Sequence, residues 1–74
     1  MKVLLIGVGG VGEAIATVAK GRPWLERMVL ADVDLERTHE VAARLGDQAV
    51  FPVEPVDASD PGQIASLARR YEVD

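Results

Sequence analysis

A glycine-rich stretch near the amino terminus places the strongest limit on what this chain can fold into. The apolar run 3–6 leads directly into the sequence Gly7-Val8-Gly9-Gly10-Val11-Gly12. A second apolar run, 28–31, is followed at once by Asp32, which lies 20 residues beyond Gly12. This order and spacing is typical of a β-α-β unit whose loop faces a ligand. It comprises a strand, a glycine-rich turn, a helix and a second strand that ends on an acidic residue.

Each glycine has a distinct expected task. Gly7 lies where the first strand ends and the chain must turn tightly, often at a positive φ that a Cβ would penalise. Gly9 leaves room for a pyrophosphate to approach the backbone, and Gly12 lets the following helix pack closely on the strand. These are the features of the dinucleotide-binding loop of a Rossmann fold.

The helix after the loop and the acid after the second strand complete the predicted site. The helix, about residues 10–20, presents its unpaired N–H groups and the positive end of its dipole to the phosphates. Asp32 can accept hydrogen bonds from the hydroxyl groups of the adenosine ribose. We include Val8 and Val11 in the predicted loop as packing residues rather than ligand contacts. The competing interpretation is that the glycines serve only a tight turn.

The remaining sequence continues the alternation, so that the predicted order is β-α-β-α-β-α. Strands are expected at 3–6, 27–31 and 49–53. Asp34 is the predicted N-cap of a second helix that ends at Leu45 before Gly46. Asp60 is the predicted N-cap of a third helix that runs to about residue 71, with Pro61 at its first position.

Two helices show apolar residues at helical spacing. We expect one buried face on each helix. In the first helix this face comprises Val11, Ala14, Ile15, Val18 and Ala19. In the second it comprises Leu35, Thr38, Val41, Ala42 and Leu45.

Strands that alternate with helices predict an α/β fold with a parallel sheet and right-handed crossovers. In the Rossmann strand order 3-2-1-4-5-6 these strands form the 3-2-1 half, and the apolar first strand lies at an open edge. We therefore expect residues 1–74 to be the N-terminal part of a dinucleotide-binding domain, with the rest of that domain and a substrate domain outside this chain.

Composition excludes several classes of protein. The chain has no cysteine, which rules out disulfides and thiolate metal sites and suits a reducing compartment. Its net charge of −4, without long runs, argues against non-specific nucleic-acid binding. No apolar stretch approaches the ~18 residues of a membrane span. We expect a cytoplasmic protein that contacts neither nucleic acid nor membrane, and scattered acids with one histidine predict no metal site.

Three segments carry a more specific resemblance. The stretch 2–12 resembles the start of saccharopine dehydrogenase-like oxidoreductases. The same family is similar in two further stretches, Val29-Leu30-Ala31-Asp32-Val33-Asp34-Leu35-Glu36-Arg37 and Val56-Asp57-Ala58-Ser59-Asp60. The resemblance covers nearly all 74 residues. The chain departs from the family at Val33, where members often carry an arginine.

The resemblance implies an enzyme of amino-acid metabolism that uses NAD or NADP. Members oxidise or reduce the C–N bond of an amino-acid-derived secondary amine by hydride transfer. The resemblance implies that the family's pyrophosphate loop corresponds to Gly7, Gly9, Gly10 and Gly12. It also implies that the family's ribose contact corresponds to Asp32. Asp57 matches a loop residue near the adenine. Catalytic and substrate-binding residues of the family lie in later segments, so this chain alone is expected to be inactive; a homo-oligomer is compatible with the resemblance.

The charge at the end of the second strand bears on the choice of cofactor. Asp32 would repel a 2′-phosphate and bind a free 2′-hydroxyl, which favours NAD over NADP. Arg37 could reach a phosphate, although a solvated Arg37 is the expectation. Position 33 is a valine rather than an arginine, so the chain lacks one side chain that could bind a 2′-phosphate.

Two other residues and two other functions also bear on the interpretation. His39, the single histidine, is expected on the surface, and Trp24 is expected to cover one end of the sheet. A regulatory nucleotide-sensing module without catalysis would share the glycine loop and the acid. The third alternative is a Rossmann domain that has lost its ligand and serves only in assembly.

Overall fold

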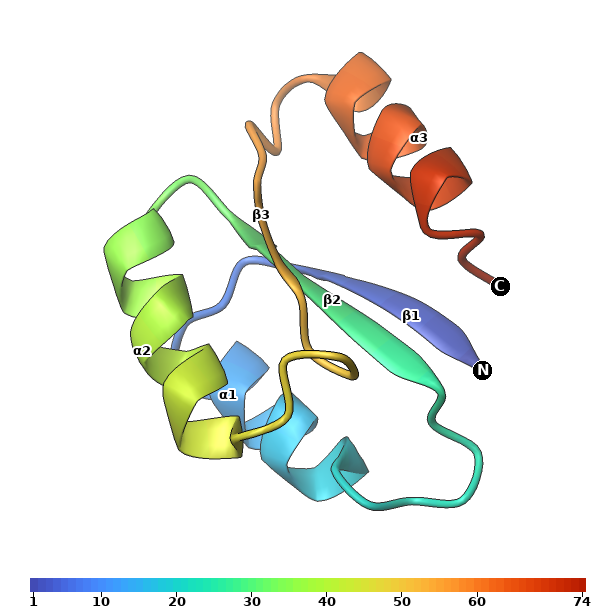
Figure 1. The fold of residues 1–74 in the computed structure, drawn as a ribbon. Coiled ribbons are helices and arrows are strands. Elements are labelled where there is room, and N and C mark those ends of the chain that lie inside the picture. Colours follow the sequence, from blue (N-terminus) through green and yellow to red (C-terminus); the bar gives the residue numbers. More distant parts are fainter.

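The computed structural model describes all 74 residues and contains three strands and three helices in strict alternation (Figure 1). The strands are β1 (Lys2–Ile6), β2 (Arg27–Asp32) and β3 (Val53–Pro55). The helices are α1 (Gly10–Ala19), α2 (Leu35–Leu45) and α3 (Pro61–Arg70). The predicted α/β class and β-α-β-α-β-α order are confirmed.

The strands form one parallel sheet in the order β1-β2-β3, which is the order expected for this half of the sheet. Lys2 pairs with Arg27 at one end of the β1–β2 ladder, and Ile6 pairs with Ala31 at the other. β1 has a neighbour on one side only, so its other side is an open sheet edge.

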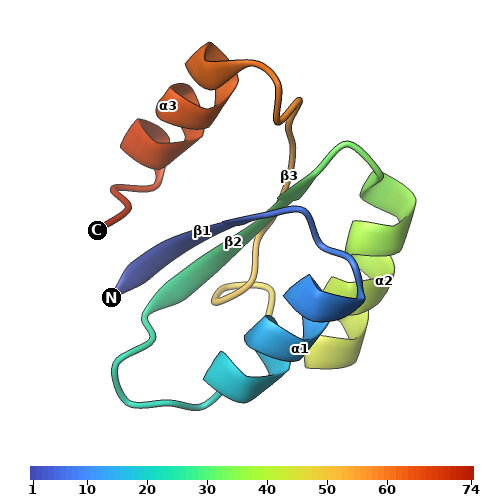
Figure 2. The same ribbon diagram turned by 180° about the vertical axis from the view of Figure 1, so that it is seen from behind.

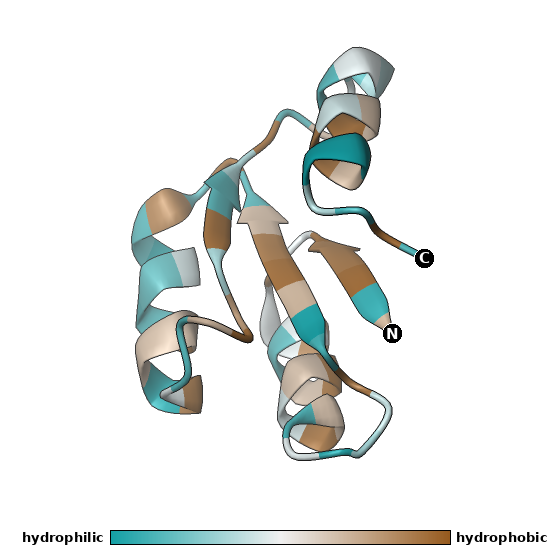
Figure 3. Ribbon diagram, turned by 45° about the vertical axis from the view of Figure 1, so that its right-hand side comes forward, coloured by the Kyte–Doolittle hydropathy of each residue, from teal (hydrophilic) through white to brown (hydrophobic).

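Helices cover the two faces of the sheet unequally (Figures 1 and 2). α1 and α2 pack on one face, where nine buried apolar residues form the main core around Leu30, Val41 and Phe51. α3 packs on the other face through Leu67, which meets Ala31 and Val56 in a smaller cluster. Apolar colouring follows the strands between these layers (Figure 3).

The third strand was predicted at 49–53, and that placement is wrong: residues 48–50 form a turn and β3 begins at Val53. Asp47 explains the difference, because its carboxylate accepts the N–H groups of Ala49 at 3.2 Å and Val50 at 3.3 Å. An aspartate that bonds the backbone two and three residues ahead favours a turn. The chain nevertheless already runs beside β2 here, since the Val50 carbonyl accepts the Met28 N–H at 2.7 Å.

The buried face of α2 matches the prediction except at Leu35, which is exposed. The face predicted for α1 is confirmed at Ala19 and wrong at its other four positions. The buried residues of α1 are the small ones, Gly12, Ala16 and Ala19. Val11, Ile15 and Val18 remain 78%, 47% and 65% exposed. Small side chains allow α1 to lie close to the sheet, and this orientation turns the larger side chains away from the core.

An exposed ion pair joins α1 to α2. Arg44 of α2 donates to the Glu13 carboxylate of α1 through Nε at 2.7 Å and through Nη2 at 2.9 Å. The Glu13 side of α1 therefore faces α2, and the side with Val11, Ile15 and Val18 faces the open edge of β1. There, nine apolar residues line a groove of about 530 Å³, with Val3 and Trp24 among them.

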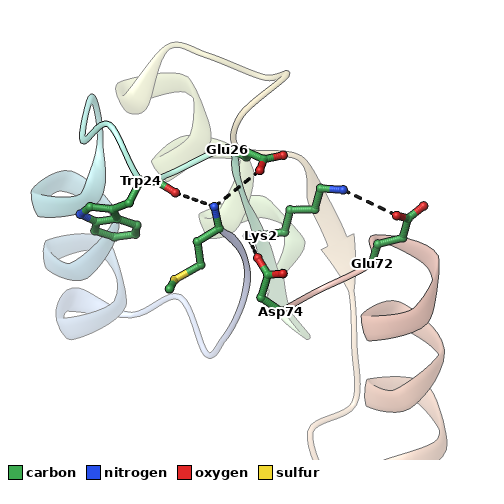
Figure 4. A network of polar contacts seen from close by, with 6 residues as sticks. Lys2, Trp24, Glu26, Glu72 and Asp74 are labelled. Carbon is green, nitrogen blue, oxygen red and sulfur yellow. Dashed lines mark hydrogen bonds and ion pairs between the residues drawn. The ribbon is translucent and has the colours of Figure 1, made fainter.

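The two chain ends meet at the beginning of β1 (Figure 4). The Lys2 N–H donates to the Asp74 carboxylate at 2.6 Å, and the Asp74 N–H donates to the Lys2 carbonyl at 3.0 Å. The α-amino group of Met1 donates to the Trp24 carbonyl at 2.6 Å and lies 3.7 Å from the Glu26 carboxylate. These contacts occupy only the first residue of the β1 edge.

Candidate functional site

The carboxyl ends of the three strands bring the predicted site residues to one edge of the sheet. β1 ends at Ile6 just before the glycine loop, β2 ends at Asp32, and β3 ends at Pro55, two residues before Asp57. The Asp32 carbonyl also accepts the Val56 N–H at 3.3 Å, which continues the pairing beyond β3. In open parallel sheets this edge is where ligands bind.

The chain turns at Gly7, which has a φ of +86°. Its N–H donates to the Ala31 carbonyl at 2.9 Å, so the loop stays tied to β2 after β1 has ended. Only glycine adopts this conformation without strain. The tight turn expected at Gly7 is therefore present.

Gly12 brings α1 against the loop. A Cβ placed on Gly12 would lie 2.6 Å from the Gly7 carbonyl oxygen, closer than real Cβ atoms approach backbone. A Cβ on Gly10 would meet nothing within 4 Å. The close helix–strand packing expected of Gly12 is thus present, and Gly10 borders open space.

The amino end of α1 differs from those of the other helices. Gly9 is its N-cap, and no side chain caps it. In contrast, the Asp34 carboxylate accepts the Arg37 N–H at the start of α2, and the Asp60 carboxylate accepts the N–H groups of Gly62 and Gln63 at the start of α3. Both predicted caps are confirmed. The first N–H groups of α1 have no such side-chain partner and can receive an anion.

Asp32 connects the end of β2 to both neighbouring segments. One carboxylate oxygen accepts the buried Val8 N–H at 2.7 Å, and the other accepts the Asp34 N–H at 3.0 Å. The residue is only 9% exposed. Donation from Asp34 first, and then from Val8, lowers the pKa of the Asp32 carboxyl below its ordinary value.

Arg37 lies over the glycine loop from the first turn of α2. A Cβ on Gly9 would lie 4.0 Å from an Arg37 guanidinium nitrogen. Arg37 is exposed, as expected of a solvated arginine, and its charge is a minor contribution to the lowered pKa of Asp32. A positive charge therefore stands beside the uncapped end of α1.

Asp57 is exposed and takes part in a local turn. Its carboxylate accepts the Ser59 hydroxyl at 2.6 Å and the Ser59 N–H at 2.9 Å. These two donors lower the pKa of Asp57, with the hydroxyl contributing most. Asp57 thus lies at the same sheet edge as Asp32 but is oriented by its own loop.

The two valines of the loop behave differently. Val8 is fully buried in the main core, so the packing role predicted for it is confirmed. Val11 is 78% exposed, and the packing role predicted for it is wrong. The reason is again the close approach of α1 through Gly12, which directs Val11 towards the groove beside β1.

Outside the loop, His39 is exposed, as predicted. Trp24 is half-exposed and lines the apolar groove beside β1, where its carbonyl accepts the α-amino group of Met1 (Figure 4). No group of three or more histidine and acidic side chains comes together in a way that could hold a metal ion.

Two features were not predicted from the sequence. One is the apolar groove, which is lined by Val11, Ile15 and Val18. Their helical spacing is the sequence signal for it, but the same spacing is equally typical of a core-facing helix. The other is a polar cleft of about 410 Å³ between β3 and α3. Beside it, the Glu54 carboxylate binds Arg70 at 2.6 Å and accepts the Tyr71 hydroxyl, an arrangement without a sequence motif.

Comparison with known proteins adds no assignment. No model of a protein family matches the chain. No solved structure matches it significantly either. None of the helices combines the length and apolarity that crossing a bilayer requires.

Proposed function

We propose that this chain binds a nicotinamide dinucleotide at the carboxyl edge of its sheet, NAD in preference to NADP. One observation carries the proposal: the uncapped start of α1 and the Asp32 carboxylate both border the glycine loop, since Gly9 is the N-cap of the helix and the Val8 N–H donates to Asp32. The helix start suits a pyrophosphate, and the carboxylate suits a ribose hydroxyl. Asp57, at the same edge, would lie near the adenine.

We further propose that the bound cofactor serves an oxidoreductase related to saccharopine dehydrogenases, acting on the C–N bond of an amino-acid-derived secondary amine. The resemblance of the three segments described above supports this assignment. The cofactor would supply hydride transfer, and the residues of this chain would hold and orient it. A cytoplasmic location is part of the proposal, supported by the absence of cysteine.

Charge supports NAD as the preferred cofactor. Asp32 is held ionised by two N–H donors and would repel a 2′-phosphate. Arg37 acts in the opposite direction, because its guanidinium lies beside Gly9 and could attract a phosphate. The carboxylate stands at the end of β2 itself, whereas Arg37 is exposed and more strongly screened.

Calorimetric titration of the chain with NADH and then NADPH tests the proposal. We expect NADH to bind more tightly, and Asp32→Ala to weaken NADH by about tenfold and NADPH by less. Asp47→Ala is the matched control, because it removes another turn-forming aspartate beyond the opposite end of α2. Equal losses for the two cofactors in Asp32→Ala would contradict the ribose assignment.

An activity assay of the entire gene product separates the proposed enzyme from a sensing module, because this chain alone is expected to be inactive. Binding of NADH by that product without oxidation by any imine formed from an amino acid and a keto acid would favour a nucleotide sensor. Binding of neither cofactor by the folded chain would leave a role in assembly alone.

A further inference from the structure

The Asp32 carboxylate lies between two parts of the proposed site that the ligand would bridge. Its two oxygens hold the N–H of Val8, in the glycine loop, and the N–H of Asp34, at the start of α2. A carboxylate offers about four acceptor positions, so that two remain for a ligand. Asp32 ends β2 at the carboxyl edge of the sheet, where the residue is 9% exposed.

The glycine loop has few other restraints. The Gly7 N–H is bound to the Ala31 carbonyl, and the Val8 side chain is anchored in the core. After Val8, the next restraint is the Gly9 carbonyl, which accepts the Glu13 N–H at 2.8 Å in the first turn of α1. The Val8–Asp32 hydrogen bond is therefore the last restraint before α1 itself, whose first N–H groups would face a pyrophosphate.

We propose that Asp32 is a positioning residue for the glycine loop as well as a ribose acceptor, so that ribose binding and pyrophosphate binding are coupled through the Val8 N–H. This inference rests on the proposed function. A ribose hydroxyl that donates to Asp32 fixes the carboxylate, and the fixed carboxylate holds Val8 and the loop behind it. The coupling is reciprocal, because a phosphate that orders the loop also orders the carboxylate.

Replacing the Val8 amide by an ester tests the coupling directly. The substitution, made by chemical synthesis, removes the Val8 N–H and leaves its side chain and Asp32 unchanged. Adenosine reports the ribose contact alone, and ADP-ribose reports ribose and pyrophosphate together. We expect the ester to change adenosine affinity by less than about twofold and to weaken ADP-ribose by about tenfold.

An ester at Ala49 is the matched control. The Ala49 N–H also donates to an aspartate carboxylate, that of Asp47, in a turn outside the site. We expect this ester to change neither affinity. Equal weakening of adenosine and ADP-ribose by the Val8 ester would overturn the coupling while leaving the proposed function in place. Binding of neither ligand to the unmodified chain would overturn both.

A measurement on the unmodified chain covers the case in which the ester fails to fold. The Val8 amide proton is expected to shift in nuclear magnetic resonance spectra as Asp32 is protonated. Adenosine is expected to move the Gly9 and Gly10 amide resonances in the wild type and not in Asp32→Asn. If adenosine binds and leaves those resonances unmoved, the coupling is absent.

Discussion

Gly12 and Gly10 lie in the same short loop but have different surroundings. A Cβ on Gly12 would collide with the Gly7 carbonyl, whereas a Cβ on Gly10 has open space around it. We expect Gly12→Ala to lower the free energy of unfolding by about 1–3 kcal/mol, because α1 must move off the loop. Gly10→Ala is the control and should leave it unchanged or raise it slightly, as measured by urea denaturation. Equal effects would contradict the packing described for Gly12.

Asp32 should make the stability of the fold depend on pH in a defined direction. Its pKa is lowered from the ordinary value of 3.8 by the N–H groups of Asp34 and Val8. A carboxyl with a lowered pKa in the folded state stabilises that state fully above the unfolded pKa. The contribution is lost as the pH falls through the folded pKa.

Urea denaturation between neutral and acidic pH measures this effect. The wild type should lose stability steeply in acid, and Asp32→Asn should show a shallower loss with less stability at pH 7. Because the pKa of Asp57 is lowered as well, the difference between the two curves, rather than the wild-type curve, reports Asp32. Parallel curves would show that its hydrogen bonds do not favour the ionised form.

The shortest helices depend most on their ends. α3 has 10 residues, and Asp60 caps it by accepting the Gly62 N–H at 2.9 Å and the Gln63 N–H at 3.3 Å. Helices of this length are marginal without such support. We expect Asp60→Ala to lower the free energy of unfolding by about 1 kcal/mol. Ser66→Ala is the control and should have little effect, because Ser66 is exposed and makes no capping bond. Circular dichroism during thermal unfolding would show the difference, and equal melting temperatures would contradict the cap.

Sequence reasoning succeeded for elements whose boundaries are set by local chemistry. The helix ends are set by hydrogen bonds or backbone conformations that need no distant partner. The residues that set them are Asp34, Asp60, Pro61 and Gly46. Sequence reasoning failed at the start of β3, although the turn bonds of Asp47 are also local. It failed again for α1, whose buried side follows from its close fit against the Gly7 carbonyl. The helical spacing of Val11, Ile15 and Val18 does not contain that information.

The same distinction between local and remote contacts applies to the candidate site. Glycine spacing and the position of Asp32 predicted the turn, the close helix approach and the shared sheet edge. The Val8–Asp32 hydrogen bond and the place of Arg37 over Gly9 depend on how the loop and α2 approach each other in space. No sequence interval encodes that approach, so these contacts emerge only from the folded chain.

At the scale of the whole molecule, the groove between α1 and the edge of β1 is the main exposed apolar surface. Such surfaces, next to an open strand edge, promote association. We expect the chain to self-associate as its concentration rises, and Val18→Lys to weaken that association by about tenfold in analytical ultracentrifugation. Thr17→Lys is the control, because it makes the same charge change at an exposed neighbour outside the groove. A wild-type chain that sediments as a monomer at millimolar concentration would contradict this.

The meeting of Lys2 with Asp74 makes the backbone an almost closed ring. Two hydrogen bonds already span the gap between residues 72 positions apart. A short linker across it would give a circular protein with the same sheet, and it would restrict the unfolded chain more than the folded one. The ring could then be reopened at the exposed turn 21–24, so that β2 becomes the first strand of a circular permutant and the former ends become an ordinary loop.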